Sequence, residues 1–183
     1  MTLIVDCGSS KVPDIVRAVK ACGHSPVITG KNTLTNAQLS NARAIIISGN
    51  PLLIRDSGKE SIIRDFSYIK HCEQALLGIC FGHQAISLVY GGQVCDGKED
   101  RGRRKLEILE ENPLFKGICN MPEFEEDHCE TASLPDNFSL LAHSTACANE
   151  AMKHKYRDIF GVQFHPELSE NGWILIRNFL ALC

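Results

Sequence analysis

The sequence lacks any hydrophobic run that reaches the roughly 18 to 20 residues needed to cross a bilayer. Residues 1–6 hold only a short apolar run without a basic leader, so we expect no signal peptide. Internal repeats, low-complexity stretches and interdomain linkers are also missing. The net charge of -3 gives no electrostatic reason to expect nucleic acid or an anionic membrane as a partner. With 44% apolar and 22% charged residues, the composition is typical of one globular domain, residues 1–183.

Cysteine is plentiful, but its pattern lacks the features of a disulfide framework. The nine cysteines are odd in number and contain no C-x-x-C pair, so we interpret them as reduced thiols of a cytoplasmic protein. Cys80 and His83 have the spacing of metal ligands, and His128 is adjacent to Cys129, but no zinc pattern is completed. We therefore predict no metal site.

The first half of the chain alternates short apolar runs with amphipathic stretches. Strands are predicted at 3–5, 26–29, 44–47 and 75–80, and helices at 12–21, 34–39, 62–71 and 83–90. In the second half, strands are predicted at 105–109, 139–142 and 159–164, followed by a closing helix at 174–182. Such alternation predicts an α/β fold, a single domain with a mostly parallel central sheet flanked by helices.

A nucleophile turn is predicted where the strand at 75–80 runs into the next helix. Cys80 has Gly78 two residues before it and Gly82 two residues after it, as in the G-x-nucleophile-x-G elbow. Glycine avoids a collision that side chains would cause in so tight a turn. The turn lifts the sulfur out of the carboxyl edge of the sheet and brings it near a helix N-terminus, which favours the thiolate.

A base for this thiol is predicted at the end of the strand at 159–164. His165 follows that strand, Pro166 fixes a bend, and Glu167 lies two positions after the histidine. A carboxylate there can accept a hydrogen bond from one imidazole nitrogen and leave the other facing the thiol. The pattern favours covalent catalysis by Cys80 over a packing role for these residues.

With a cysteine elbow followed by this His–Pro–Glu segment, the sequence resembles the class I (triad) glutamine amidotransferases. Residues 78–84 match the G-x-C-x-G-x-Q motif of that family, and residues 161–167 match its G-x-Q-F-H-P-E motif. The resemblance covers essentially the whole chain and implies a flavodoxin-like fold. It also implies a catalytic triad of Cys80, His165 and Glu167, in which the cysteine attacks the glutamine amide and the histidine takes its proton.

The same resemblance implies further site residues. Those for glutamine are Gln84 and the main chain of Asp127, His128, Cys129 and Glu130. The backbone N–H of Phe81 and that of the loop at Gly49 and Asn50 would form the oxyanion hole. Asn50 stands where the family has glycine, and we expect the left-handed conformation that asparagine tolerates to place this N–H.

Within the family, the sequence is most similar to the amidotransferase subunit of GMP synthase. The segments that indicate this are 151–154 and 114–117. The similarity implies hydrolysis of glutamine through a cysteine thioester, with ammonia passed to a separate synthetase subunit that makes GMP from XMP. Because the chain has no phosphate-cradling motif, no cofactor is expected in it, and ATP and Mg²⁺ are expected on the partner subunit.

Three alternatives stay open at this point. The chain could serve another acceptor, act as a stand-alone γ-glutamyl or amide hydrolase, or be a non-catalytic regulatory subunit. A basic cluster at 101–105 is interpreted as a solvated loop, in preference to a docking patch, and an acidic cluster occupies 123–130.

Overall fold

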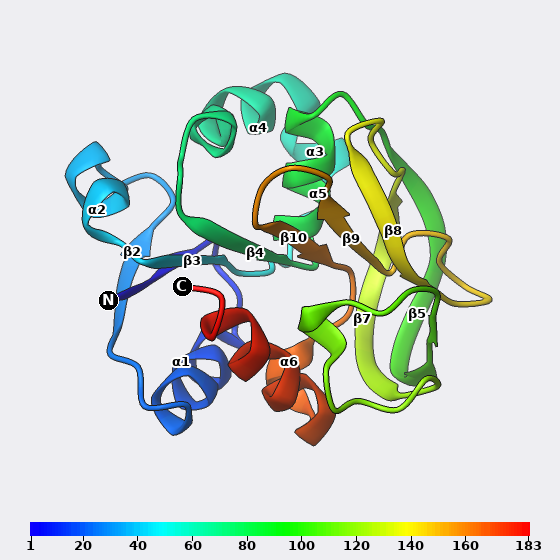
Figure 1. The fold of residues 1–183 in the computed structure, drawn as a ribbon. Coiled ribbons are helices and arrows are strands. Elements are labelled where there is room, and N and C mark those ends of the chain that lie inside the picture. The colour runs from blue at the N-terminus through cyan, green and yellow to red at the C-terminus, as the bar shows by residue number, and fades with distance from the viewer.

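The computed structural model describes the backbone of residues 1–183 and every side chain except that of Ser57. An eight-stranded sheet forms its centre, in the order β2-β1-β3-β4-β10-β9-β8-β6 (Figure 1). Its parallel strands are β1 (Thr2–Asp6), β2 (Pro26–Gly30), β3 (Ala44–Ile47), β4 (Ala75–Ile79) and β10 (Ile159–Val162). The antiparallel strands β9 (Ala151–His154), β8 (Phe138–His143) and β6 (Glu107–Ile108) extend it.

Helices cover both faces of the parallel part of the sheet. On one face lie α1 (Val12–Ala21) and α6 (Glu170–Leu180). On the other lie α2 (Asn36–Asn41), α3 (Ile54–Ser57), α4 (Lys59–Asp65) and α5 (Phe81–Val89). Successive strand residues face opposite sides, so Ile4 packs with α1 and α6, whereas Leu3 and Val5 pack on the other face.

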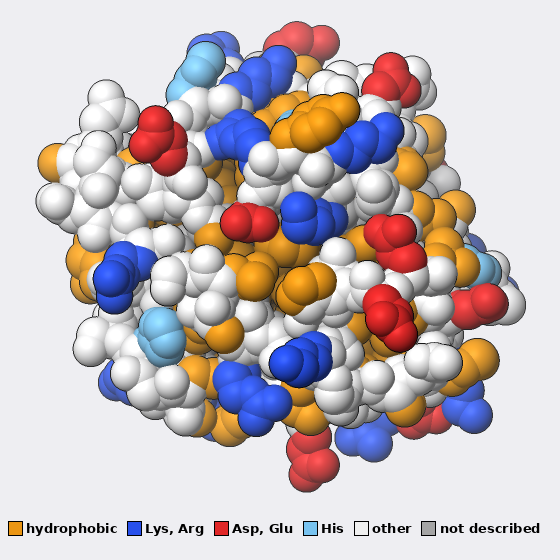
Figure 2. Space-filling view, in the orientation of Figure 1, with side chains coloured by type: hydrophobic (Ala, Val, Ile, Leu, Met, Phe, Trp, Pro, Cys, Tyr) orange, Lys and Arg blue, Asp and Glu red, His pale blue; other side chains and the backbone are white. Residues whose placement is uncertain are grey.

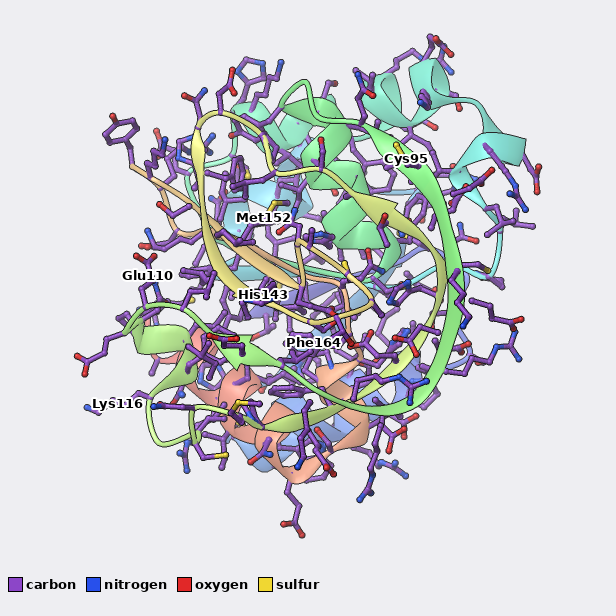
Figure 3. All side chains as sticks on the ribbon, turned by 90° about the vertical axis from the view of Figure 1, so that its right-hand side faces the viewer. Cys95, Glu110, Lys116, His143, Met152 and Phe164 are labelled. Atoms are coloured by element: carbon purple, nitrogen blue, oxygen red, sulfur yellow. The ribbon has the colours of Figure 1, made fainter. Side chains whose placement is uncertain are left out.

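A second sheet of two antiparallel strands stands beside the main one. It pairs β5 (Val94–Lys105) with β7 (Glu123–Ala132), and Figure 3 shows both arching over the end of the molecule. Phe124 of β7 stacks on Phe164, which follows β10, with ring centroids 4.1 Å apart. Short 3-10 turns complete the fold at Ser67–Lys70, Pro113–Phe115 and Pro166–Leu168.

The predicted fold class is confirmed, but several predicted elements differ. The helix expected at 62–71 is two pieces, α4 and a 3-10 turn, because Phe66 between them leaves helical geometry. In the range 105–109, Lys105 belongs to β5 and only Glu107–Ile108 pair with β8. The basic cluster at 101–105 lies on a strand and is no loop, since β5 and β7 pair there.

The surface mixes charges of both signs. Figure 2 shows lysine and arginine side chains interspersed with aspartate and glutamate on the face toward the viewer. Across the described part of the chain, none of the helices has the length and apolar character to cross a membrane.

Candidate active site

Cys80 lies at the turn between β4 and α5 in a strained backbone conformation. Its φ of 51° makes it the one non-glycine residue with a positive φ in the described chain. A Cβ on Gly78 would lie 2.5 Å from the backbone of Gly82, and a Cβ on Gly82 would lie 2.6 Å from the Ile47 carbonyl oxygen. The two glycines therefore allow the close approach that presents the sulfur at the carboxyl edge of the sheet.

His165 and Glu167 meet beside this sulfur, just after β10. The imidazole Nδ1 lies 2.8 Å from a carboxylate oxygen of Glu167, and both side chains are buried. The backbone N–H of His165 donates to the Glu125 carbonyl of β7 at 2.8 Å. The indole N–H of Trp173 donates to the Glu167 carbonyl at 3.0 Å. One hydrogen bond thus holds the imidazole, and two more hold the backbone of the residues that carry the pair.

The electrostatics of this group favour a protonated imidazole. Burial on its own lowers the pKa of His165, but hydrogen bonds to Cys80 and Glu167, with the negative charge of each, raise that pKa to about 10. A positive imidazole beside sulfur stabilises the thiolate, which is the nucleophilic form. The arrangement places a thiol beside the base that can activate it for attack on a carbonyl.

The loop after β3 passes directly beside the pair. A Cβ on Gly49 would lie 3.3 Å from the His165 ring and 3.8 Å from the Cys80 Cβ. Ser48 holds this loop, since its hydroxyl accepts from the Cys7 N–H at 2.9 Å and donates to the Gly49 carbonyl at 3.0 Å. Asn50 does not adopt the left-handed conformation, so the loop does not require glycine there. The role of its N–H in the oxyanion hole stays a prediction.

Two glutamines connect the nucleophile with β7. The Gln84 amide nitrogen donates to the Glu130 carbonyl at 2.9 Å and to the side-chain oxygen of Gln163 at 3.3 Å. The Gln163 amide in turn lies 3.7 Å from the Cys80 sulfur. Sequence reasoning missed Gln163 as a site residue, although its place in the second motif was the signal.

The predicted glutamine-binding segment, residues 127–130 of β7, forms the opposite wall. The Asp127 carbonyl oxygen is 4.0 Å from the Cys80 sulfur. The Glu130 carboxylate turns away and accepts from the backbone N–H groups of Ile54 and Arg55, at 2.7 and 3.1 Å. It thereby ties β7 to the first turn of α3.

A cavity of about 230 Å³ lies between these elements, and charged side chains stand at its edge. Asp127 pairs with Lys11 at 2.6 Å and with Arg101 at 3.4 Å, and the hydrogen bond from Lys11 lowers the pKa of its carboxyl. Neither Lys11 nor Arg101 was predicted as a site residue. The cavity is lined by Ser9, Ser10, Lys11, Asn50, Pro51, Leu52, Leu53, Cys80, Gln84, Arg101, Asp127, His128, Cys129, Glu130 and His165.

Two further histidines, His83 and His128, are buried near the site but do not contact Cys80. Burial lowers the pKa of His83 to about 3, so the imidazole is neutral, and it packs against Gly161. His128 lies on β7 with its Nε2 3.3 Å from a carboxylate oxygen of Glu126. Among the described residues, the positions predicted from the two motifs converge at one edge of the sheet.

Comparison with known proteins matches residues 3–181 to the family model of the class-I glutamine amidotransferases. A Pyrococcus abyssi protein, named as a subunit of glutamine-hydrolyzing GMP synthase, is 38% identical over all of this chain and 98% of its own length. The protein of the same name from Methanocaldococcus jannaschii is 37% identical over all of this chain and 97% of its own.

Among solved structures, a proposed GMP synthase subunit from Thermoplasma acidophilum superposes with a TM-score of 0.91. The two share 27% identity, over all of this chain and 92% of the other. A Thermotoga maritima glutamine amidotransferase superposes with a TM-score of 0.77 at 20% identity, over 99% of this chain and 80% of the other, which shows the shared fold.

Proposed function

Because the chain belongs to the class-I glutamine amidotransferase family, we propose that Cys80 releases ammonia from glutamine for a separate synthetase subunit. The observation that carries the proposal is the strained Cys80 beside the buried His165–Glu167 pair. Strain of this kind persists in native proteins where surrounding structure holds it, and it occurs most often at functional sites.

The reaction follows from the placement of Cys80 beside His165 and Glu167. The Cys80 thiolate adds to the side-chain amide carbon of glutamine, and the carbonyl oxygen becomes an oxyanion. The backbone N–H groups of Phe81 and of the loop at Gly49 and Asn50 stabilise that charge. When the C–N bond breaks, the nitrogen takes the proton of His165 and leaves as ammonia. The neutral imidazole then removes a proton from water, which adds to the thioester and yields glutamate.

Binding of glutamine is assigned to the cavity wall. Gln84 holds the main chain of Glu130 in place, so the backbone of residues 127–130 presents fixed polar groups to the substrate. Glutamine is a zwitterion, and the edge of the cavity offers the Asp127 carboxylate together with the Lys11 ammonium. Charges of both signs there suit an amino acid better than an anion.

The acceptor is inferred from the relatives. Their names indicate the glutamine-hydrolyzing GMP synthase, so we propose that ammonia passes to a partner subunit that converts XMP to GMP. ATP and Mg²⁺ would be bound by that partner and not by this chain. The free state of all nine cysteines supports a cytoplasmic location.

The test begins with the chain alone and Cys80→Ala. Glutamate release from glutamine should fall to background in this variant, and an electrophilic glutamine analogue should label Cys80 alone among the nine cysteines. Cys72→Ala is the matched control, because Cys72 is also buried but lies outside the site. Retained hydrolysis in Cys80→Ala, or labelling of another cysteine, would overturn the assignment.

Adding an ATP-pyrophosphatase subunit of GMP synthase with XMP, ATP and Mg²⁺ tests the acceptor. GMP formed from glutamine, and absent with Cys80→Ala, is the expected result. Glutaminase activity that the partner leaves unchanged would favour a stand-alone hydrolase or another acceptor. Absence of both activities would favour a non-catalytic role.

A further inference from the structure

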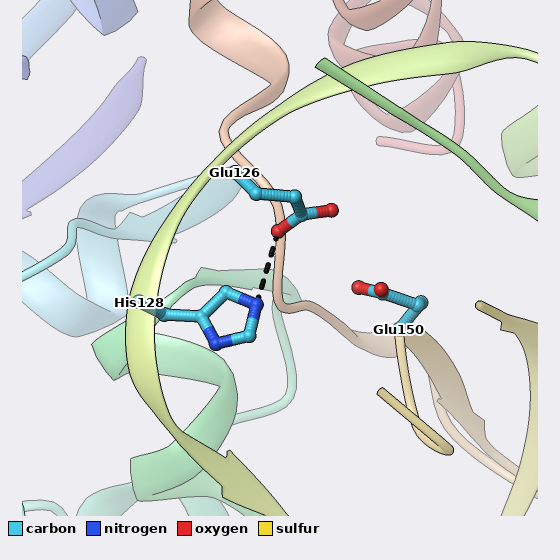
Figure 4. A group of neighbouring side chains, drawn as sticks. All are labelled: Glu126, His128 and Glu150. Carbon is cyan, nitrogen blue, oxygen red and sulfur yellow. Dashed lines mark ion pairs between the residues drawn. The ribbon is translucent and has the colours of Figure 1, made fainter. Parts of the chain in front are cut away.

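In the pocket wall lies a cluster of buried side chains, one of them that of the cavity-lining His128, to which the proposed reaction gives no role. Glu126 and His128 lie two residues apart on the inner face of β7, and Glu150 precedes β9 (Figure 4). One possible ligand atom from each residue lies within 4.8 Å of those of the other two. Two elements far apart in the sequence therefore bring two carboxylates and an imidazole to one point.

The side chains of the cluster are buried, and the protein offers their polar atoms few hydrogen-bond partners. The exposed fractions of Glu126, His128 and Glu150 are 3%, 7% and 0%. Within the described side chains, no hydrogen bond of good geometry reaches the four carboxylate oxygens of the two glutamates. The carboxyls interact weakly with each other and with the Ser144 hydroxyl, and the His128 Nε2 lies 3.3 Å from an oxygen of Glu126. Buried carboxylates without donors are costly, so the site calls for an additional ligand.

His165 and Arg104 favour the charged form of Glu126 electrostatically, but each of them is already paired with another group. Arg104 is paired with Asp100 at 2.6 Å, and His165 is held by Cys80 and Glu167. The Ser144 hydroxyl interacts with the Glu150 carboxyl and favours its charged form, but a hydroxyl carries no positive charge that could balance the carboxylate. Two carboxylates thus need two positive charges, from one divalent ion or from two protons.

The donor set discriminates among divalent ions. An imidazole nitrogen with two carboxylate oxygens suits Zn²⁺ and neighbouring transition ions, whereas Mg²⁺ and Ca²⁺ prefer oxygen alone. Asp100 adds a third buried carboxylate that interacts electrostatically with both glutamates, and its second oxygen has no hydrogen-bond partner. We propose that Glu126, His128 and Glu150 bind one Zn²⁺, which links β7 to the segment before β9.

The ion would brace the active site without taking part in the reaction. The residues between and beside its ligands, Asp127 and Cys129, line the cavity, and the carbonyl of Glu150 accepts from the Gln163 N–H at 2.8 Å. Zinc would therefore fix the wall of the cavity and the strand that delivers His165. This proposal departs from the expectation of no metal site, which rested on cysteine and histidine spacing alone.

The experiment uses the full chain after dialysis against a chelator. Isothermal titration with Zn²⁺ should give one tight site, and saturating Zn²⁺ should raise Tm on the order of 5 °C. Because nine cysteines could also bind zinc, Co²⁺ serves as a second probe. Ligation by oxygen and nitrogen lacks the strong near-ultraviolet band of a cobalt–thiolate bond.

Glu150→Gln keeps the shape of the side chain and removes its charge, so Zn²⁺ affinity should fall at least about 100-fold. Glu126→Gln is the second variant, in case the first fails to fold. Glu107→Gln is the matched control, since Glu107 also lies beside a histidine, at 3.5 Å, but is exposed. Wild type that binds no Zn²⁺, a cobalt–thiolate band at the tight site, or affinity unchanged in both cluster variants would overturn the proposal and leave the carboxyls holding protons only.

Discussion

At the residue scale, His165 connects most of the site. Its ring contacts Glu167 and Cys80, its backbone is held by β7, and the glycine loop after β3 passes close to it. The two motifs made Cys80, His165 and Glu167 predictable, because a nucleophile and its base need fixed residue types at fixed turns. The contact between Gln163 and Cys80 could not be predicted in this way, because it depends on which strands are neighbours in the sheet. The order of the strands in the sheet cannot be derived from the motifs.

The first prediction at this scale concerns the rate of glutamine hydrolysis in Glu167→Gln. The amide keeps the size of the side chain but loses the charge that orients and stabilises the imidazolium. We expect a loss of up to about 10⁴ in rate, with activity still measurable. Glu60→Gln, at an exposed position on α4, should retain the wild-type rate. A wild-type rate in Glu167→Gln would exclude a positioning role for Glu167.

The pair of His165 and Glu167 predicts how the free energy of unfolding depends on pH. Histidine in an unfolded chain has a pKa of about 6.5, and the folded state raises that of His165 to about 10. The stabilisation is therefore fully present below pH of about 6.5 and is lost as the pH rises toward 10. The difference in free energy of unfolding between wild type and Glu167→Gln, from urea titrations, should shrink across that range. A difference that grows with pH would contradict a protonated His165.

At the element scale, the parallel strands could be predicted from the sequence, whereas the sheet of β5 and β7 could not. Strands such as β3 are buried on both faces and appear as continuous apolar runs. β5 is mostly exposed and rich in charge, so hydropathy gives no strand signal. Cross-strand pairs such as Arg103 with Glu125, at 2.8 Å, hold it to β7 instead. Their recognition requires the register of the pairing.

The elbow between β4 and α5 predicts a steric effect for Gly78→Ala. The added methyl would lie 2.5 Å from the backbone of Gly82, so the turn must open. We expect a loss of about 1–3 kcal/mol in the free energy of unfolding, and a slower alkylation of Cys80 by the glutamine analogue. Gly30→Ala is the control, because its methyl would meet only the Thr33 hydroxyl, at 3.3 Å. Equal effects in both variants would show that the tight turn has no special role.

At the scale of the whole molecule, a chain that releases ammonia for a separate synthetase subunit should depend on that partner. We expect the partner subunit, loaded with ATP and XMP, to raise kcat for glutamine by about 10² to 10³, the contribution of one oxyanion donor. The loop at Gly49 and Asn50 would supply this donor. KM should change less, because the Gln84 contact with β7 is already formed. Full activity in the isolated chain, in steady-state kinetics, would contradict this coupling.

The position of Trp173 has an optical consequence. It is the chain's one tryptophan, and its indole N–H is bonded to the Glu167 carbonyl while part of the ring reaches solvent. Tryptophan fluorescence of this protein therefore comes from one indole ring on α6, which is hydrogen-bonded to the turn that carries Glu167. If substrate or a docked synthetase displaced that turn, the wavelength and intensity of the tryptophan emission would change, and no added dye would be needed to follow it.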